Sequence, residues 1–159
     1  MKKFIFLIPV LLSGCMTIAA FQTKGNEMLK SKTLSVSIQN TPENVYEFVA
    51  RPENLPLWAT TFVHSIKQEN GEWIIETDKG PAKIRIAEKN ILGILDHTVY
   101  PAPGVEVFVP MRVVKNGPGC EVIFTLFQQP AMSEIDFASD MRMVEQDLLT
   151  LKALMEIHG

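Results

Sequence analysis

Cysteine is scarce in this chain of 159 residues, which contains only Cys15 and Cys120. Two thiols are too few for a disulfide framework or for a zinc site built from four cysteines. Cys120 follows a Gly-Pro-Gly turn, and we interpret it as a small hydrophobic strand residue. Clustered positive charge is also missing: the net charge is −3, and no run of Lys or Arg follows Lys2 and Lys3. Nucleic-acid binding needs a basic face, so the composition argues against that class.

The short motifs that mark common enzymes are absent as well. The chain has no nucleophile elbow, no phosphate-binding loop, no dinucleotide glycine motif and no paired zinc cysteines. Its three histidines, His64, His97 and His158, do not stand at metal-ligand spacing. We therefore expect neither a metal nor a cofactor. No motif requires catalysis, although a few polar groups in a pocket would suffice for an enzyme, and this alternative stays open.

One unbroken apolar stretch, Phe4 to Leu12, lies directly after Lys2 and Lys3. It has the length of a signal peptide and is too short to span a bilayer as a helix. The sequence that follows, Leu12-Ser13-Gly14-Cys15, resembles the lipobox of bacterial lipoproteins, in which the cysteine is diacylated before cleavage. The resemblance implies that Cys15 anchors the mature protein to a membrane, facing the periplasm or the cell exterior. Stable anchoring needs two acyl chains or more.

Two other interpretations of this segment stay open. Leu-Ser-Gly-Cys also fits by chance within an ordinary secretory signal, and translation from Met28 would give a cytoplasmic protein. On the lipoprotein interpretation, residues 1–14 are the signal peptide, 15–32 are a tether without periodicity, and 33–157 are the folded domain. Hydrophobic residues make up 47% of the chain and charged residues 21%, which is typical of a globular protein with one core.

Alternating and helical patterns predict the order of elements in that domain. Residues 33–39 alternate as a half-buried strand, and Thr41-Pro42-Glu43 then carries the signals of a helix N-terminus. Arg51-Pro52 ends this helix, and a short second helical element covers 54–60. Turns such as Asn70-Gly71 divide 63–129 into antiparallel strands. Their expected ranges are 73–77, 83–87, 94–99, 105–114 and 121–128, with Pro110 indicating an edge or a bulge in the fourth.

A long helix closes the chain. Ser133 followed by Asp136 resembles a capping box, and apolar residues then recur every three or four positions. This stripe comprises Phe137, Met141, Val144, Leu148, Leu151 and Met155. The strands and the helix must each bury one face. We therefore predict an α+β fold in which a curved antiparallel sheet grips the C-terminal helix and leaves a cavity between them.

The opening of the domain resembles that of START-like domains. Residues 41–49, TPENVYEFV, and 52–58, PENLPLW, are similar to their first helix and to a second helix ending in Trp. The similarity extends over 33–157 through the order of elements. This superfamily, also called SRPBCC, contains Bet v 1-like allergen carriers, lipid-transfer domains, polyketide cyclases and chaperone activators. The resemblance implies the helix-grip fold strongly and a function only weakly.

The expected cavity would be lined mainly by aromatic and methionine side chains. We expect the lining to include Trp58, Phe62, Trp73, Phe108, Phe124, Phe127, Met132, Phe137 and Met141. Ordinary core packing is the competing interpretation for each of them. His97 would be the polar group inside if Leu95, His97 and Val99 face the cavity; otherwise it is a hydrogen-bonded strand residue. Arg112 would bind a ligand carboxylate if it points inward, and its alternative place is the solvent face.

Three functions are compatible with this pattern. The first is binding or carriage of a small hydrophobic molecule, lipid- or isoprenoid-like. The second is a cyclase or hydrolase that uses His97 and Arg112 in the same pocket. The third is a protein-interaction module with a vestigial pocket. A cavity of several hundred Å³ would favour the first two, and a collapsed cavity would favour the third.

Overall fold

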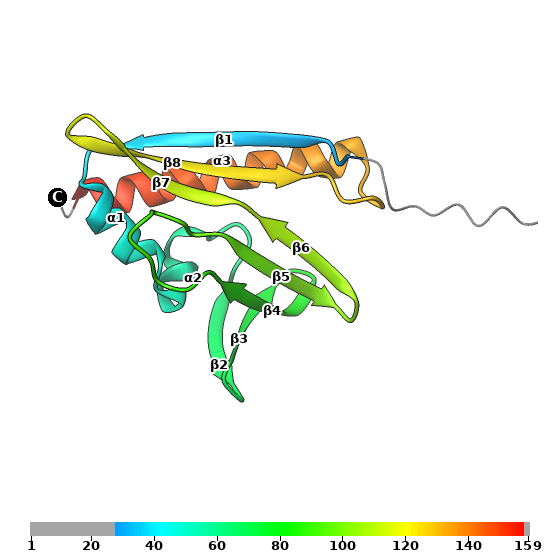
Figure 1. Ribbon diagram of the computed structural model, residues 1–159. Helices are drawn as coiled ribbons and strands as arrows, with labels where there is room; N and C mark the ends of the chain where they lie inside the picture. The colour runs from blue at the N-terminus through cyan, green and yellow to red at the C-terminus, as the bar shows by residue number, and fades with distance from the viewer. Residues whose placement is uncertain (1–27, 158–159) are drawn as a thin grey trace, which may run out of the picture.

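The computed structural model describes residues 28–157 and has the expected α+β helix-grip architecture (Figure 1). A curved antiparallel sheet lies beside one long C-terminal helix, and short helices follow the first strand. In chain order the elements are β1 (Ser31–Ile38), α1 (Pro42–Val49), the 3-10 helix η1 (Pro52–Asn54), α2 (Leu55–Trp58), β2 (Ser65–Glu69), β3 (Glu72–Thr77), β4 (Gly80–Ile86), β5 (His97–Ala102), β6 (Val105–Val109), β7 (Met111–Asn116), β8 (Gly119–Phe127) and α3 (Glu134–Ile157).

The strands pair in two ladders, β1-β8-β7 and β2-β3-β4-β5-β6. The ladders meet at Pro110, which separates β6 from β7. Before Pro110 the chain pairs with β5, and after it the chain pairs with β8. Proline has no N–H for a ladder bond, so this is a natural place for the strand to bend. Leu95 N–H donates to the Met111 carbonyl at 2.9 Å, which joins the ladders into one curved surface.

Local sequence signals explain where several elements begin and turn. The Thr41 side chain accepts a hydrogen bond from Asn44 N–H and caps α1, with proline in the first turn, as expected. Asn70 and Gly71 both have positive φ, the geometry of a two-residue hairpin between β2 and β3. Ser133 Oγ accepts from Asp136 N–H at 3.1 Å, which confirms the cap at the start of α3.

Some boundaries differ from the expected ones. β1 begins at Ser31, inside the segment expected to be a tether, because pairing with β8 extends as far as Phe127. β5 begins at His97 rather than at residue 94, since the Asp96 carboxylate takes the Met111 N–H in place of a regular ladder. The expected strand 105–114 is two strands, with the bend at Pro110 between them.

α3 packs chiefly against β1, and also against α2 (Figure 1). The predicted stripe is most deeply buried at Phe137, Leu148 and Leu151. Met141 is only half-buried. Asn40, buried just before α1, donates from Nδ2 to the Met155 carbonyl at 2.8 Å and so satisfies the last turn of α3. Among the helices of residues 28–157, none is long and apolar enough to cross a bilayer.

Candidate functional site

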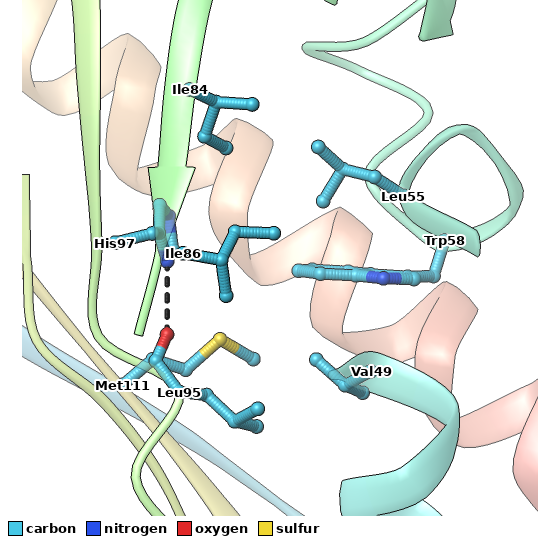
Figure 2. A pocket seen from close by; sticks show the side chains of 8 residues that line it. All are labelled: Val49, Leu55, Trp58, Ile84, Ile86, Leu95, His97 and Met111. Carbon is cyan, nitrogen blue, oxygen red and sulfur yellow. Dashed lines mark hydrogen bonds between the residues drawn. The ribbon is translucent and has the colours of Figure 1, made fainter. Parts of the chain in front are cut away.

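A small cavity lies between the short helices and the inner face of the sheet (Figure 2). Its volume is about 10 Å³. Eight residues line it: Val49, Leu55, Trp58, Ile84, Ile86, Leu95, His97 and Met111. None of the eight belongs to α3, so the cavity is bounded by α1, α2 and the sheet rather than by the long helix. This differs from the expected position between the sheet and the C-terminal helix.

Strand alternation determines which side chains reach this cavity. Ile84 and Ile86 face inward from β4, while Arg85 between them is exposed. Ile86 stands opposite His97 in the β4–β5 register, so both side chains lie on the same face. Trp58 comes from the last residue of α2, and in Figure 2 its indole ring extends between Leu55 and Val49 toward the sheet. Segments far apart in the sequence therefore form one apolar wall.

His97 is the polar ring of the cavity, and it is electrically neutral there. Its Nδ1 lies 3.1 Å from the Leu95 carbonyl oxygen (Figure 2). A carbonyl only accepts hydrogen bonds, so this contact assigns a proton to Nδ1. Burial lowers the pKa of His97 and outweighs the opposing effects of the Leu95 carbonyl and Asp96. The ring also meets Phe124 edge-on, with centroids 5.9 Å apart.

Trp58 contributes an unpartnered donor. Its side chain is 3% exposed, and within residues 28–157 its Nε1 is the one buried side-chain nitrogen or oxygen atom without a hydrogen-bond partner. A buried donor without an acceptor destabilises a fold by about 1–3 kcal/mol. The site therefore combines an apolar wall, a neutral imidazole and a free indole N–H.

Arg112, expected as a ligand-binding group, is bound within the protein instead. Its guanidinium donates to the Asp96 carboxylate and to the Met111 carbonyl, and the Met111 N–H donates to the same carboxylate. Burial alone would raise the pKa of Asp96, but these hydrogen bonds and the arginine charge lower it. The pair lies beside Pro110, where the sheet bends, and Arg112 does not line the cavity.

The other expected lining residues are dispersed. Phe62 and Phe108 are 40% and 49% exposed, whereas Phe137, in the first turn of α3, is buried. Phe124 is buried against His97. Half-buried positions on β3, β8, the loop before α3 and α3 itself hold Trp73, Phe127, Met132 and Met141. Of the eleven residues expected at the site, the cavity thus brings together Trp58 and His97. Cys15, the expected lipidation site, lies outside the described residues.

Sequence reasoning did not single out five lining residues: Val49, Leu55, Ile84, Ile86 and Met111. Leu95 was expected to face the cavity only if His97 does, and both line it. The other five are ordinary aliphatic core residues by pattern. The one available signal was strand alternation, which puts Ile84 and Ile86 on the inner face of β4. Alternation identifies which face of the sheet is buried, but it does not show whether a void lies beside that face.

A second depression lies on the surface between α1, η1 and the end of α3. It is a wide groove of about 380 Å³. Its lining is mixed: Asn40, Asn44, Glu47, Phe48, Arg51, Asn54 and Met155. The amides are engaged internally, since the Asn40 oxygen accepts from Thr41 N–H and from Asn44, and Asn54 donates to the Phe48 carbonyl. The groove therefore lies on the outside of the contact in which Asn40 caps the C-terminal end of α3.

The side chains around the cavity are almost all apolar. Its eight lining residues include no serine, cysteine, carboxylate or lysine, so it offers no evident nucleophile. Across residues 28–157, no group of three or more His, Cys, Asp or Glu side chains is placed to hold a metal ion.

Comparison with known proteins identifies the fold. The sequence matches no protein-family model. A search of the curated proteins finds no match either. Among solved structures, XoxI from Bacillus cereus is similar with a TM-score of 0.66 at 18% identity, covering 80% of this chain and 96% of that chain.

Two further structures extend this similarity. The Aha1 dimer from Colwellia psychrerythraea gives a TM-score of 0.63 at 13% identity, covering 81% of this chain and 98% of that chain. Ara h 8.0201, a Bet v 1-like protein, gives 0.58 at 10% identity, covering 80% and 98%. At these identities the likeness establishes the shared fold, and the protein has the Bet v 1-like helix-grip fold.

Proposed function

We propose that this protein binds a small, mainly apolar molecule in its interior, between α1, α2 and the inner face of the sheet. One observation carries the proposal: the cavity there has an apolar wall that includes Trp58, and the indole N–H of this residue is buried without a partner. Apolar pockets with a few well-placed polar groups are the usual form of small-molecule sites. Burial of apolar surface would drive binding at about 25 cal/mol per Å², before ordering costs.

The guest must enlarge the cavity, because about 10 Å³ holds no more than a single water molecule. α2 is the element best suited to move. It has four residues and contributes Leu55 and Trp58 to the wall. The loop after it is held to α3 through Asp147, which accepts from Thr61 N–H at 2.9 Å and from Thr61 Oγ1 at 2.8 Å. A displacement of α2 and of the aliphatic side chains around Trp58 would open the site from this side.

A second function, a protein-interaction module, is favoured by the small size of the same cavity. If the interior stays closed, the protein would act through contacts of its surface with a partner rather than through its pocket. The Aha1 structure, which shares the fold, is that of a dimer. Leu57 and Phe62, which flank the buried Trp58, are 53% and 40% exposed and would be available to a partner.

Binding of an apolar probe separates the two functions. We expect protein purified without detergent to bind 2-acetylnaphthalene in equilibrium dialysis. Ile86→Phe, which fills the cavity, should weaken binding at least tenfold. Ile74→Phe is the matched control, because Ile74 stands opposite Lys83 and faces away from the cavity. Binding by neither wild type nor control would reject the small-molecule function and leave the interaction module. Equal binding by Ile86→Phe would place the guest elsewhere.

We also propose that the domain acts at a membrane surface, anchored by acyl chains on Cys15. The support is the order of positive residues, apolar stretch and Leu-Ser-Gly-Cys in the first fifteen residues. Cys15→Ala should shift the protein from the membrane fraction to the soluble fraction of its native host. Cys120→Ala is the control, since Cys120 is buried and free. A soluble distribution of both wild type and Cys15→Ala would reject anchoring and favour a start at Met28.

A further inference from the structure

The indole N–H of Trp58 needs an acceptor that the protein does not supply. Its neighbours in the cavity wall are aliphatic side chains, a thioether and His97. The one hydrogen bond recorded for the His97 ring is that of Nδ1 with the Leu95 carbonyl. Buried polar groups in folded proteins nearly always have partners, and an exception points to a water, an ion or a ligand that completes the site.

The missing acceptor must be uncharged. The eight lining residues include no Lys or Arg, and burial lowers the pKa of His97 and so disfavours its charged form. Arg112, which follows the lining residue Met111, is occupied by Asp96, and Arg85, between Ile84 and Ile86 on β4, is exposed on the other face of the strand. A carboxylate or phosphate that entered this wall would lose its hydration without gaining a counter-ion, which is strongly unfavourable. A carbonyl, ether or hydroxyl oxygen loses far less hydration free energy on entry. Such an oxygen can accept a hydrogen bond from an N–H with the same geometry as a charged oxygen.

We infer that the guest is an apolar molecule with a neutral oxygen at its buried end, and that this oxygen accepts a hydrogen bond from Trp58 Nε1–H. The inference rests on the proposed function, since it names the chemical class of the molecule bound in that cavity. It also excludes the class that Arg112 suggested by sequence, ligands that carry a carboxylate.

Matched probes test the hydrogen bond apart from the shape of the pocket. The set is 2-acetylnaphthalene, 2-isopropylnaphthalene and 2-naphthoate, which share the ring and differ in the oxygen and the charge. Wild type should bind the ketone about three- to tenfold more tightly than the hydrocarbon, and the carboxylate least. Trp58→Phe keeps an aromatic ring but removes the N–H, so both neutral probes should then bind with similar affinity. Trp73→Phe is the matched control and should keep the preference.

The outcomes distinguish this inference from the function on which it rests. If neither neutral probe binds wild-type protein, the small-molecule function and the inference both fail. If both bind without a preference for the ketone, or if Trp58→Phe keeps the preference, only the inference fails. A higher affinity for 2-naphthoate than for the ketone would also overturn it, because the site would then contain a positive charge.

Nuclear magnetic resonance supplies a readout that does not depend on the stability of Trp58→Phe. The chain has two tryptophans and so gives two indole N–H signals, of which Trp73→Phe removes one and thereby assigns both. The ketone should move the Trp58 signal downfield and slow its exchange with solvent, and the hydrocarbon should not. Identical responses to the two probes would contradict the inference.

Discussion

Buried polar groups are satisfied in one half of the molecule, around α3 and β1, but not in the other half, around α1 and α2. Two buried polar residues that contact or belong to α3 are fully engaged: Asn40 donates to the last turn of α3, and Asp147 on α3 holds the loop after α2. Where α1 and α2 meet the other half of the sheet, a void remains and Trp58 Nε1 has no partner. The comparison indicates that the α3–β1 half provides stability, while the α1–α2 half retains the space and the free donor on which the proposed binding rests.

The largest expected effect tests the stable half. Leu148 is 2% exposed and lies in the stripe of α3, whereas its neighbour Leu149 is 49% exposed. Leu148→Ala should lower the free energy of unfolding by about 2–5 kcal/mol, and Leu149→Ala by less than about 0.5 kcal/mol. Urea denaturation of both variants measures the difference. Equal losses would mean that α3 is not held through this face, and the division into two halves would be wrong.

Asp147 tests the connection between the halves. Burial raises the pKa of its carboxyl group, and the two hydrogen bonds from Thr61 oppose this only in part. Asp147→Ala removes the acceptor for the Thr61 N–H and leaves the Thr61 hydroxyl only the Met143 carbonyl at 3.3 Å, so it should lower the free energy of unfolding by about 1–3 kcal/mol. Asp147→Asn keeps an acceptor and should lower it less.

The raised pKa of Asp147 also fixes a sign for the dependence of stability on pH. Its contribution is fully present below the unfolded value of about 4 and is lost as pH rises through the folded pKa. Wild-type protein should therefore lose stability relative to Asp147→Asn across that interval. Denaturation of both proteins at a series of pH values gives the difference. A difference that does not change with pH, or that has the opposite sign, would show that the carboxyl is better solvated than its 5% exposed fraction indicates.

The parts of this fold that the sequence predicted are those set by local chemistry. Thr41-Pro42 begins α1, Asn70-Gly71 forms a hairpin, and Ser133 caps α3, because each depends on residues within a few positions of one another. The Asp96–Arg112 pair was not foreseen. Its place at the bend follows from how β5, β6 and β7 meet, which no local pattern encodes.

The cavity was predicted as a class of feature but not in its place or size. Helix-grip proteins suggested a space beside the C-terminal helix, and the side chains of Leu55, Trp58 and Ile86 place it beside α2 instead. Its volume depends on how well side chains from five segments fill one space. Packing of this kind is decided at the level of single methyl groups, below what hydrophobic periodicity can resolve.

The smallest expected effect tests whether the two halves are separate in binding. Met141 is half-buried on α3 and does not line the cavity. A carboxylate at this position can reach solvent, so Met141→Glu should change the affinity for 2-acetylnaphthalene by less than about twofold. Gln146→Glu, which adds the same charge at an exposed position on the same helix, is the control. Equilibrium dialysis on protein shown to be folded by circular dichroism measures both affinities. Loss of binding in folded Met141→Glu alone would mean that the guest reaches α3, and the binding space would then extend across both halves.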